Sequence, residues 1–339
     1  MKTFSIGVDL GGTNLRIAAY TRDQEKLESI SIPTRLEAGK YAVVKDMCDA
    51  IHEIAGKLRG ERELLGVGVG SPGPLQLPSG KLYHLPNFPG WDGFELKIEI
   101  EKVLGMPVII ENDANAAALA EFLHGSGQQR GVNSLCMLTL GTGVGNGIIL
   151  NRKVWHGMLG MGGEAGHGPL EYDGALCGCG GRGCLEQYAS ATAVSRMAKE
   201  AAEAGKSAAM AKVIATKGRI SAHEVAVLAD QGDEGARGVY SEVGRFLGMS
   251  LCQLVNSLNL PLYVIGGGVA SSWHLFAPKM FEVLTRDSYV YRLTAAQGQM
   301  DMDPLRTSVV PALLGPESGL LGAAMLPFAE LEDLAALPS

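Results

Sequence analysis

The sequence carries little net charge and lacks a long apolar run. Lysine and arginine number 29 against 36 acidic residues in a chain of 339, which leaves a net charge of −7 and no basic stretch. Nucleic acids and anionic membranes bind clustered positive charge, so we expect neither as a partner. No window approaches the ~20 apolar residues of a membrane span, and the N-terminus lacks the features of a secretory signal. We therefore expect a cytoplasmic protein.

Two common nucleotide-binding patterns are also missing. Gly205-Lys206-Ser207 matches the end of the P-loop pattern GxxxxGK[ST]. The first glycine of that pattern would fall at position 200, which is a glutamate, so the pattern is not met. GxGxxG spacing occurs at Gly68–Gly73 and at Gly178–Gly183, but Pro72 interrupts the first and no apolar strand precedes the second. Neither stretch can open the helix of a dinucleotide-binding unit. A P-loop enzyme and a dehydrogenase are therefore disfavoured.

Glycine, by contrast, is abundant and gathers in short apolar runs. The 46 glycines are about twice the average usage. Strand-like and helical patterns alternate, which is typical of an α/β protein, and the length is enough for two domains. The expected strands cover residues 4–20 (two around a turn), 65–70, 108–110, 135–150 (two again) and 262–269; the expected helices cover 40–59, 94–104, 114–122, 191–215, 221–259 and 318–329.

The second half of the chain repeats its opening. Residues 135–150, LCMLTLGTGVGNGIIL, align with residues 5–20, SIGVDLGGTNLRIAAY, so that Thr139 corresponds to Asp9. Two such hairpins would place similar glycine turns on either side of a cleft between two lobes. The alternative is chance, because any two β-hairpins look alike over so short a stretch.

Three glycine turns are candidates for binding phosphate. Glycine has no Cβ, so the backbone amides of such a turn can approach phosphate oxygens; the alternative is that each turn only reverses the chain. Asp9, before the first turn, could face a magnesium ion through water, or it could stabilise the turn by an Asx contact. The turns are Gly11-Gly12-Thr13, Gly141-Thr142-Gly143 and Gly266-Gly267-Gly268.

Asp113 stands where a buried strand passes into an alanine-rich helix. Either Asn112 or Asp113 could cap that helix. Asp113 could also serve phosphoryl transfer by orienting a hydroxyl group and accepting its proton as the new P–O bond forms. An aspartate, with a pKa near ~3.9, cannot remove that proton in the ground state. The two roles are compatible, because capping would hold the carboxylate in place.

A sugar acceptor needs many short polar contacts, and several polar residues lie in glycine-rich or loop segments. Each of them alone could be ordinary surface, so the hypothesis depends on their joint occurrence. The candidate contacts are Asn87, Asn112, Glu164 and Glu186, with Trp91 and Phe94 as pocket walls.

Four metal-binding side chains occur close together with the spacing H-x9-C-x-C-x4-C, which suits tetrahedral zinc. Four protein ligands leave no open position, so the site is expected to be structural and to hold the loop between Glu164 and Glu186. A Cys177–Cys184 disulfide or unligated thiols are the alternatives. The candidate ligands are His167, Cys177, Cys179 and Cys184.

Together these motifs resemble the ROK family of bacterial sugar kinases and repressors, within the actin-like/hexokinase ATPase superfamily. The resemblance covers nearly the whole chain. It rests on DLGGTN at 9–14, ENDANAA at 111–117, GTGVG at 141–145, and EAGH at 164–167 followed by CGCGGRGCLE at 177–186. The last pair looks like the zinc signature of the family with every ligand present.

The resemblance implies a two-lobed, actin-like ATPase fold (ribonuclease H-like) with a zinc-stabilised loop insertion. Residues 1–115, completed by a C-terminal helix at 317–339, would form the smaller lobe and 116–316 the larger. It also implies that Asp113 is the catalytic base, that Asp9 lies by the phosphates and Mg²⁺ of ATP, and that the chain forms a homodimer. The implied sugar contacts are Asn87, Asn112, Asp113, Glu164, His167 and Glu186. His167 would then serve zinc with one ring nitrogen and the sugar with the other.

The expected activity is phosphorylation of a hexose by ATP, with D-glucose as the leading substrate. PNFPGW at 86–91 and the cysteine cluster look most like the glucokinases of the family. Kinases acting on N-acetylmannosamine, N-acetylglucosamine or fructose share nearly all these residues. The alternative of another class is a non-catalytic, sugar-responsive regulator. Family repressors carry an additional N-terminal helix-turn-helix domain, whereas this chain begins at its first expected strand, so we expect no DNA binding.

Overall fold

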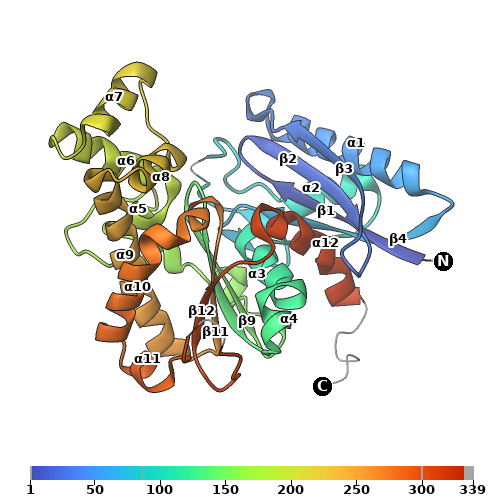
Figure 1. Ribbon diagram of the computed structural model, residues 1–339. Coiled ribbons are helices and arrows are strands. Elements are labelled where there is room, and N and C mark those ends of the chain that lie inside the picture. The colour runs from blue at the N-terminus through green and yellow to red at the C-terminus, as the bar shows by residue number, and fades with distance from the viewer. Residues whose placement is uncertain (1, 86, 299–300, 332–339) are drawn as a thin grey trace. The chain divides into compact units, whose positions relative to one another are not determined.

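The computed structural model describes residues 2–85, 87–298 and 301–331 (Figure 1). Contacts divide the chain into two compact units: residues 1–129, 147–163 and 316–339, and residues 130–146 and 164–315. The first unit thus takes in 116–129 and 147–163, which the expected boundaries placed in the larger lobe. The end of the expected C-terminal helix, 332–339, lies outside the described residues. Over the described ranges, no helix combines the length and apolar character needed to cross a membrane.

The first unit is built on a five-stranded sheet in the order β3-β2-β1-β4-β7. β1, β2 and β3 are antiparallel neighbours, whereas β1, β4 and β7 run parallel. The strands are β1 (Lys2–Leu10), β2 (Asn14–Tyr20), β3 (Lys26–Pro33), β4 (Arg62–Ser71) and β7 (Val108–Asn112); β5 (Leu75–Gln76) and β6 (Lys81–Leu82) form a separate hairpin.

Alternation along β1 sends different side chains to the two faces of this sheet. Phe4, Ile6 and Val8 join a hydrophobic core with apolar residues of α1 and α2. Ser5 lies on the other face, where its hydroxyl donates to the carbonyl oxygen of Ala324 in α12. The helices of this part of the chain are α1 (Lys40–Leu58), α2 (Leu96–Leu104), α3 (Asp113–His124), α4 (Ser126–Arg130) and α12 (Ser318–Leu331).

Helix α12 packs closely on β1, β4 and α3 (Figure 1). A Cβ on Gly68 would overlap the carbonyl oxygen of Ala323, and a Cβ on Gly322 would overlap that of Ala116. These glycines therefore allow backbones to touch. Because α3 packs against α12 in this way, the first unit extends beyond residue 115.

We expect Gly68→Ala to lower the free energy of unfolding by about 3 kcal/mol, the upper end of the usual cost of overpacking, because the added methyl group meets a helix backbone. Gly56→Ala is the matched control: a Cβ there has no atom within 4 Å, and alanine favours a helix by up to about 1 kcal/mol over glycine. Thermal unfolding of both variants measures the difference. A Gly68→Ala chain as stable as the wild type would contradict the close approach of α12.

The second sheet has the order β10-β9-β8-β11-β12, which repeats the pattern of the first. In each sheet, three consecutive strands come first and are followed by two strands that lie on the other side of the first strand and run parallel to it. Asp9 pairs with Gly70 and Thr139 pairs with Gly266, so Asp9 and Thr139 hold equivalent positions, as the repeated hairpin predicts. The strands are β8 (Leu135–Leu140), β9 (Val144–Leu150), β10 (Lys153–Val154), β11 (Leu262–Gly266) and β12 (Ser308–Pro311). The division between the two units passes through β9.

The helices of the second unit include α9 and α10, which pack side by side (Figure 1). A capping box of Ser221 and Glu224 begins α8, as its spacing predicts. The helices are α5 (Glu186–Ala189), α6 (Ala191–Glu203), α7 (Ala208–Lys217), α8 (Ala222–Asp230), α9 (Glu234–Leu258), α10 (Trp273–Asp287) and α11 (Tyr289–Thr294).

The two long helices expected at 191–215 and 221–259 are each broken in two, so that expectation was wrong. Gly205 has φ +70° and Gly232 has φ +95°, a conformation that ends a helix. Ser207 and Asp233 then cap α7 and α9 by accepting from backbone amides.

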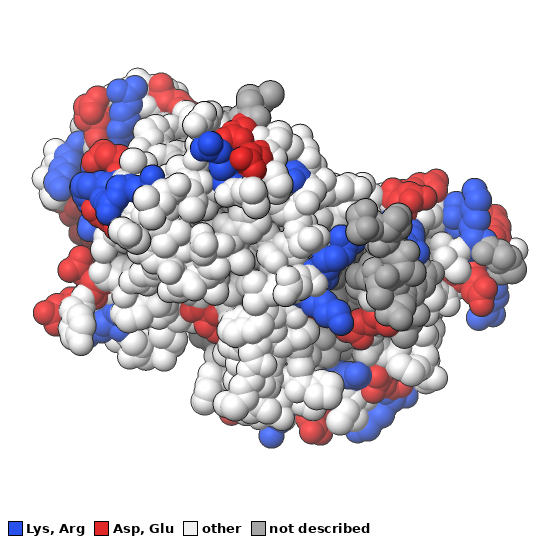
Figure 2. Space-filling view, turned by 90° about the horizontal axis from the view of Figure 1, so that it is seen from below, with Lys and Arg blue, Asp and Glu red and all other residues white. Residues whose placement is uncertain are grey.

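Basic and acidic side chains are interspersed on the face drawn in Figure 2, and large uncharged areas separate them. Among the described residues drawn on this face, basic side chains do not form one continuous patch.

Candidate active site

The parallel strands of the first sheet end together at one edge, where several predicted residues lie. Asp9 of β1 is beside Gly70 of β4, and Gly70 is beside Glu111 of β7. Asn112 and Asp113 follow Glu111 at once. The carboxyl edge of a parallel sheet is the usual binding edge of α/β proteins, so this edge is the candidate site of the first unit.

Asn112 is the residue that caps α3. Its side-chain oxygen accepts from the backbone amides of Ala114 at 2.9 Å and Asn115 at 3.2 Å. Asp113 is the first helical residue, and its Oδ1 accepts from the Ala114 amide at 2.7 Å. The cap therefore fixes the backbone that carries the Asp113 carboxylate.

The first glycine turn is held by Thr34. The Thr34 amide donates to the Thr13 carbonyl oxygen at 2.8 Å, and its hydroxyl donates to the Gly11 carbonyl oxygen at 2.7 Å. A Cβ on Gly12 would lie 4.0 Å from the Cβ of Asn87. The structure thus brings Asn87, a predicted sugar contact, beside this turn.

Asp9 has an arginine partner across the hairpin. One of its carboxylate oxygens accepts from Arg16 Nε at 2.9 Å and also from Nη2. Arg16 in turn donates to the Pro316 carbonyl oxygen at 3.2 Å, just before α12. Sequence analysis did not identify Arg16, although the antiparallel register that pairs positions 9 and 16 follows from the predicted hairpin.

The second and third glycine turns lie side by side at the carboxyl edge of the second sheet. Gly266 pairs with Thr139, and a Cβ on Gly267 would lie 2.5 Å from the Leu140 carbonyl oxygen. Thr192 donates its hydroxyl to the Thr142 carbonyl oxygen at 2.8 Å. Two of the three predicted phosphate turns are therefore neighbours within one unit.

Glu186 supports the second turn. One carboxylate oxygen accepts from the Val144 amide at 3.0 Å, and a Cβ on Gly143 would overlap that oxygen. The other oxygen lies 3.8 Å from the Cys177 sulfur. Glu186 therefore links the cysteine cluster to the turn, a connection that sequence analysis did not foresee.

Glu164 and His167 flank Gly166, which packs against Val144 at the start of β9. The His167 amide donates to the Glu164 carbonyl oxygen at 3.0 Å, and a Cβ on Gly166 would overlap the Val144 carbonyl oxygen. The three predicted sugar contacts of the second unit, Glu164, His167 and Glu186, are thus grouped around Val144, whereas Asn87, Asn112 and Asp113 belong to the first unit.

The predicted metal ligands are brought together with donor atoms that all lie within 4.8 Å of one another. The Cys177 sulfur is 3.6 Å from His167 Nδ1, and the Cys179 sulfur is 3.7 Å from that of Cys184. Tetrahedral zinc would separate two sulfurs by about 3.8 Å and a sulfur from a nitrogen by about 3.6 Å, so the donor set fits zinc.

The cysteine thiols of the cluster also fit a zinc site. All six cysteines lie in the described residues and none is disulfide-bonded, so the alternative of a Cys177–Cys184 disulfide is wrong. Burial and the neighbouring thiols raise the pKa of Cys184 to about 12. A thiolate at that position therefore needs a cation to stabilise it.

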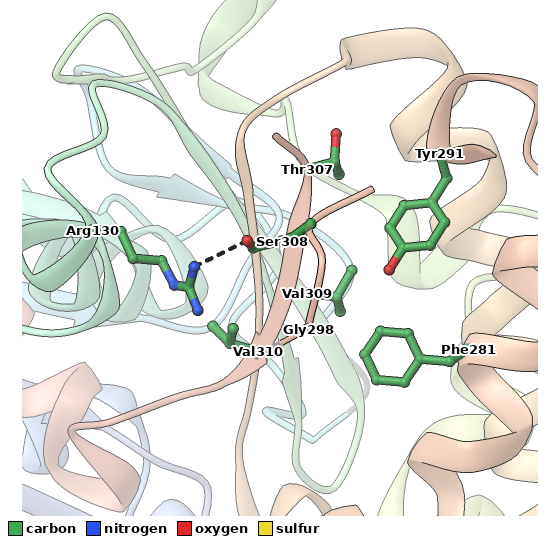
Figure 3. A pocket seen from close by; sticks show the side chains of 9 residues that line it. Arg130, Phe281, Tyr291, Gly298, Thr307, Ser308, Val309 and Val310 are labelled. Carbon is green, nitrogen blue, oxygen red and sulfur yellow. Dashed lines mark hydrogen bonds between the residues drawn. The ribbon is translucent and has the colours of Figure 1, made fainter. Parts of the chain in front are cut away.

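A cavity of about 230 Å³ opens beside β12 in the second unit (Figure 3). Arg130 donates to the Ser308 hydroxyl at its margin, at 3.0 Å, and Phe281 and Tyr291 face it from the helices. The residues that line this cavity include none of the predicted site residues.

Two α/β units, each with the same sheet order and with glycine turns at the carboxyl edge, define the fold of the actin-like ATPases. The ROK family profile matches residues 5–329, and the chain belongs to the ROK family.

Curated relatives and solved structures agree with this assignment. The chain is 38% identical over 269 residues to the glucokinase of Halalkalibacterium halodurans, covering 79% of this chain and 81% of the relative. It is 34% identical over 322 residues to the glucokinase of Thermotoga maritima, covering 95% of this chain and 96% of that relative. This structure is also similar, with a TM-score of 0.78 and 31% identity, to the crystal structure of a ROK family glucokinase from Streptomyces griseus in complex with glucose and AMPPNP. The match covers 95% of this chain and 98% of that chain.

Proposed function

We propose that this protein transfers a phosphoryl group from ATP to a hexose, and that the hexose is D-glucose. The observation that carries the proposal is the position of Asp113, held by the Asn112 cap at the carboxyl edge of the first sheet. The relatives at 34–38% identity are glucokinases, and the similar solved structure was obtained with glucose and AMPPNP.

Asp113 is the proposed catalytic base. It orients a sugar hydroxyl toward the γ-phosphorus and accepts the proton as the new P–O bond forms, while the bond from the γ-phosphorus to the bridging oxygen breaks and ADP leaves. The hydroxyl, with a pKa near the ~15.7 of water, is not deprotonated beforehand. The Asn112 cap keeps the carboxylate in position during this transfer.

The glycine turns are the proposed phosphate-binding segments, since their amides can approach phosphate oxygens without an intervening Cβ. Magnesium, bound with ATP, would neutralise phosphate charge. Asp9 would act on that ion through water, because one of its oxygens already accepts from Arg16. The turns are Gly11–Thr13, Gly141–Gly143 and Gly266–Gly268.

The proposed sugar contacts are Asn87, Asn112, Asp113, Glu164, His167 and Glu186. His167 would ligate zinc through Nδ1, which faces the Cys177 sulfur, and leave Nε2 for the sugar. Zinc would be structural, because His167 and the three cysteines fill a tetrahedral shell. From the family resemblance we also propose a cytoplasmic homodimer without a nucleic-acid or membrane partner.

ADP release from Mg-ATP, measured with glucose, N-acetylglucosamine, N-acetylmannosamine and fructose, tests the proposal. We expect kcat/KM for glucose to exceed the other values by at least about tenfold, equivalent to 1.4 kcal/mol of discrimination. Preference for a different hexose would keep the kinase mechanism and replace the substrate. No ADP release with any of the four would contradict the proposed function and favour the sugar-responsive regulator.

A further inference from the structure

Glu111 is a buried carboxylate two residues before the candidate base. Its residue is 3% exposed, and each of its oxygens has a partner. Oε1 accepts from the Asn112 amide at 2.8 Å and from Asn115 Nδ2 at 3.0 Å, while Oε2 meets His156 Nε2 at 2.5 Å. A carboxylate so deeply buried is stable only when its oxygens are paired.

Glu111 contacts residues on both sides of Asp113 in the sequence, Asn112 before it and Asn115 after it. Asn112, whose amide Glu111 accepts, is the cap of α3, and Asn115 contributes both its side chain to Glu111 and its amide to the cap. Glu111 thus accepts from the backbone just before Asp113 and from the Asn115 side chain just after it. A shift of this carboxylate would move the turn that carries the base.

His156 is itself held in place by its own segment. The Trp155 amide donates to the Ile148 carbonyl oxygen at 2.8 Å, and the Gly162 amide donates to the His156 carbonyl oxygen at 2.8 Å. A Cβ on Gly162 would lie 2.8 Å from the Trp155 ring, so the loop closes tightly around His156. The imidazole therefore reaches Glu111 from a hydrogen-bonded segment that lies more than forty residues further along the chain.

We infer that His156 is a positioning residue for Asp113, acting through the buried carboxylate of Glu111; the inference rests on the proposed role of Asp113. Without the imidazole, one oxygen of Glu111 is left buried without its partner, and the carboxylate shifts toward another donor. This shift loosens the turn from 112 to 115, and a misplacement of about 1 Å can cost up to ~10²-fold in rate.

The charges around His156 and Glu111 make the stability of this contact depend on pH. The hydrogen bond with Glu111 raises the pKa of His156, and the nearby Glu330 of α12 raises it further; Lys97 of α2 lies near Glu330. Since the folded-state pKa of His156 is above the ordinary value of 6.5, the stability contributed by protonated His156 is present below about pH 6.5 and is lost as pH rises through the folded-state pKa of His156.

The test compares His156→Ala and His156→Gln with wild type, and uses His52→Gln as the matched control, because His52 is exposed on α1. We expect His156→Ala to lower kcat by roughly 10–100-fold with KM for glucose changed less than about threefold. His156→Gln, which keeps an N–H donor, recovers most of kcat but loses the pH-dependent part of the stability. The control leaves kcat unchanged.

Hydrogen exchange of the backbone amides from Asn112 to Asn115 provides a readout that needs no activity. We expect faster exchange in His156→Ala at a temperature where the chain is otherwise folded. If wild type phosphorylates no hexose, the proposed function fails, and this exchange alone decides the inference. A folded His156→Ala chain with wild-type exchange, and with kcat within about twofold where activity exists, overturns it.

Discussion

Replacing Asp113 with asparagine is expected to lower kcat for glucose phosphorylation by roughly 10²–10⁴-fold, or about 3–5 kcal/mol of transition-state stabilisation. The amide cannot accept the hydroxyl proton as the P–O bond forms. Its oxygen can still accept from the Ala114 amide, which lies 2.7 Å from Asp113 Oδ1. The fold and the binding of glucose should therefore largely survive.

Steady-state kinetics together with glucose binding by calorimetry separate these two effects. Asp23→Asn is a suitable control, because Asp23 is exposed in the turn between β2 and β3 and the change removes the same charge. The assignment of the base would be wrong if Asp113→Asn turned over within about threefold of wild type, well below the ~10² expected for a general base.

Loss of one of the cysteines proposed to bind zinc is expected to have the second-largest effect on activity. Cys184→Ser should abolish binding of one equivalent of zinc and reduce kcat/KM by at least about 10²-fold, since even changes around metal ligands cost 10–100-fold. Structural zinc contributes about 10–16 kcal/mol in small peptides, enough to order a loop. Glu186 links this cluster to the second glycine turn through Cys177 and Val144, so disorder in the loop would reach the proposed phosphate site.

Zinc content by mass spectrometry and limited proteolysis of the loop at 164–186 check this prediction. Cys252→Ala is the control, because Cys252 is buried in α9, where its sulfur contacts the Val283 carbonyl oxygen at 3.9 Å. It should retain zinc. Full activity of wild type after exhaustive removal of zinc would contradict a structural role for the metal.

Local sequence patterns determined much of this protein. The alternation in β1 and the helical spacing in α1 follow from short-range periodicity, and the capping box at Ser221 follows from two residues three apart. The repeated hairpin predicted that Asp9 and Thr139 hold equivalent positions, which the strand registers confirm. The spacing of His167 and the three cysteines predicted a cluster whose donor atoms the structure places within 4.8 Å.

The tertiary structure alone decided which partners those residues have. His156 contacts Glu111, and Glu186 contacts Val144. Both pairs are more than forty residues apart, so no local periodicity relates them. Gly68 is likewise explained only by α12, whose backbone arrives from more than 250 residues away. Such contacts depend on how strands and helices stack, because the backbone path, and not the local pattern, brings these atoms within bonding distance.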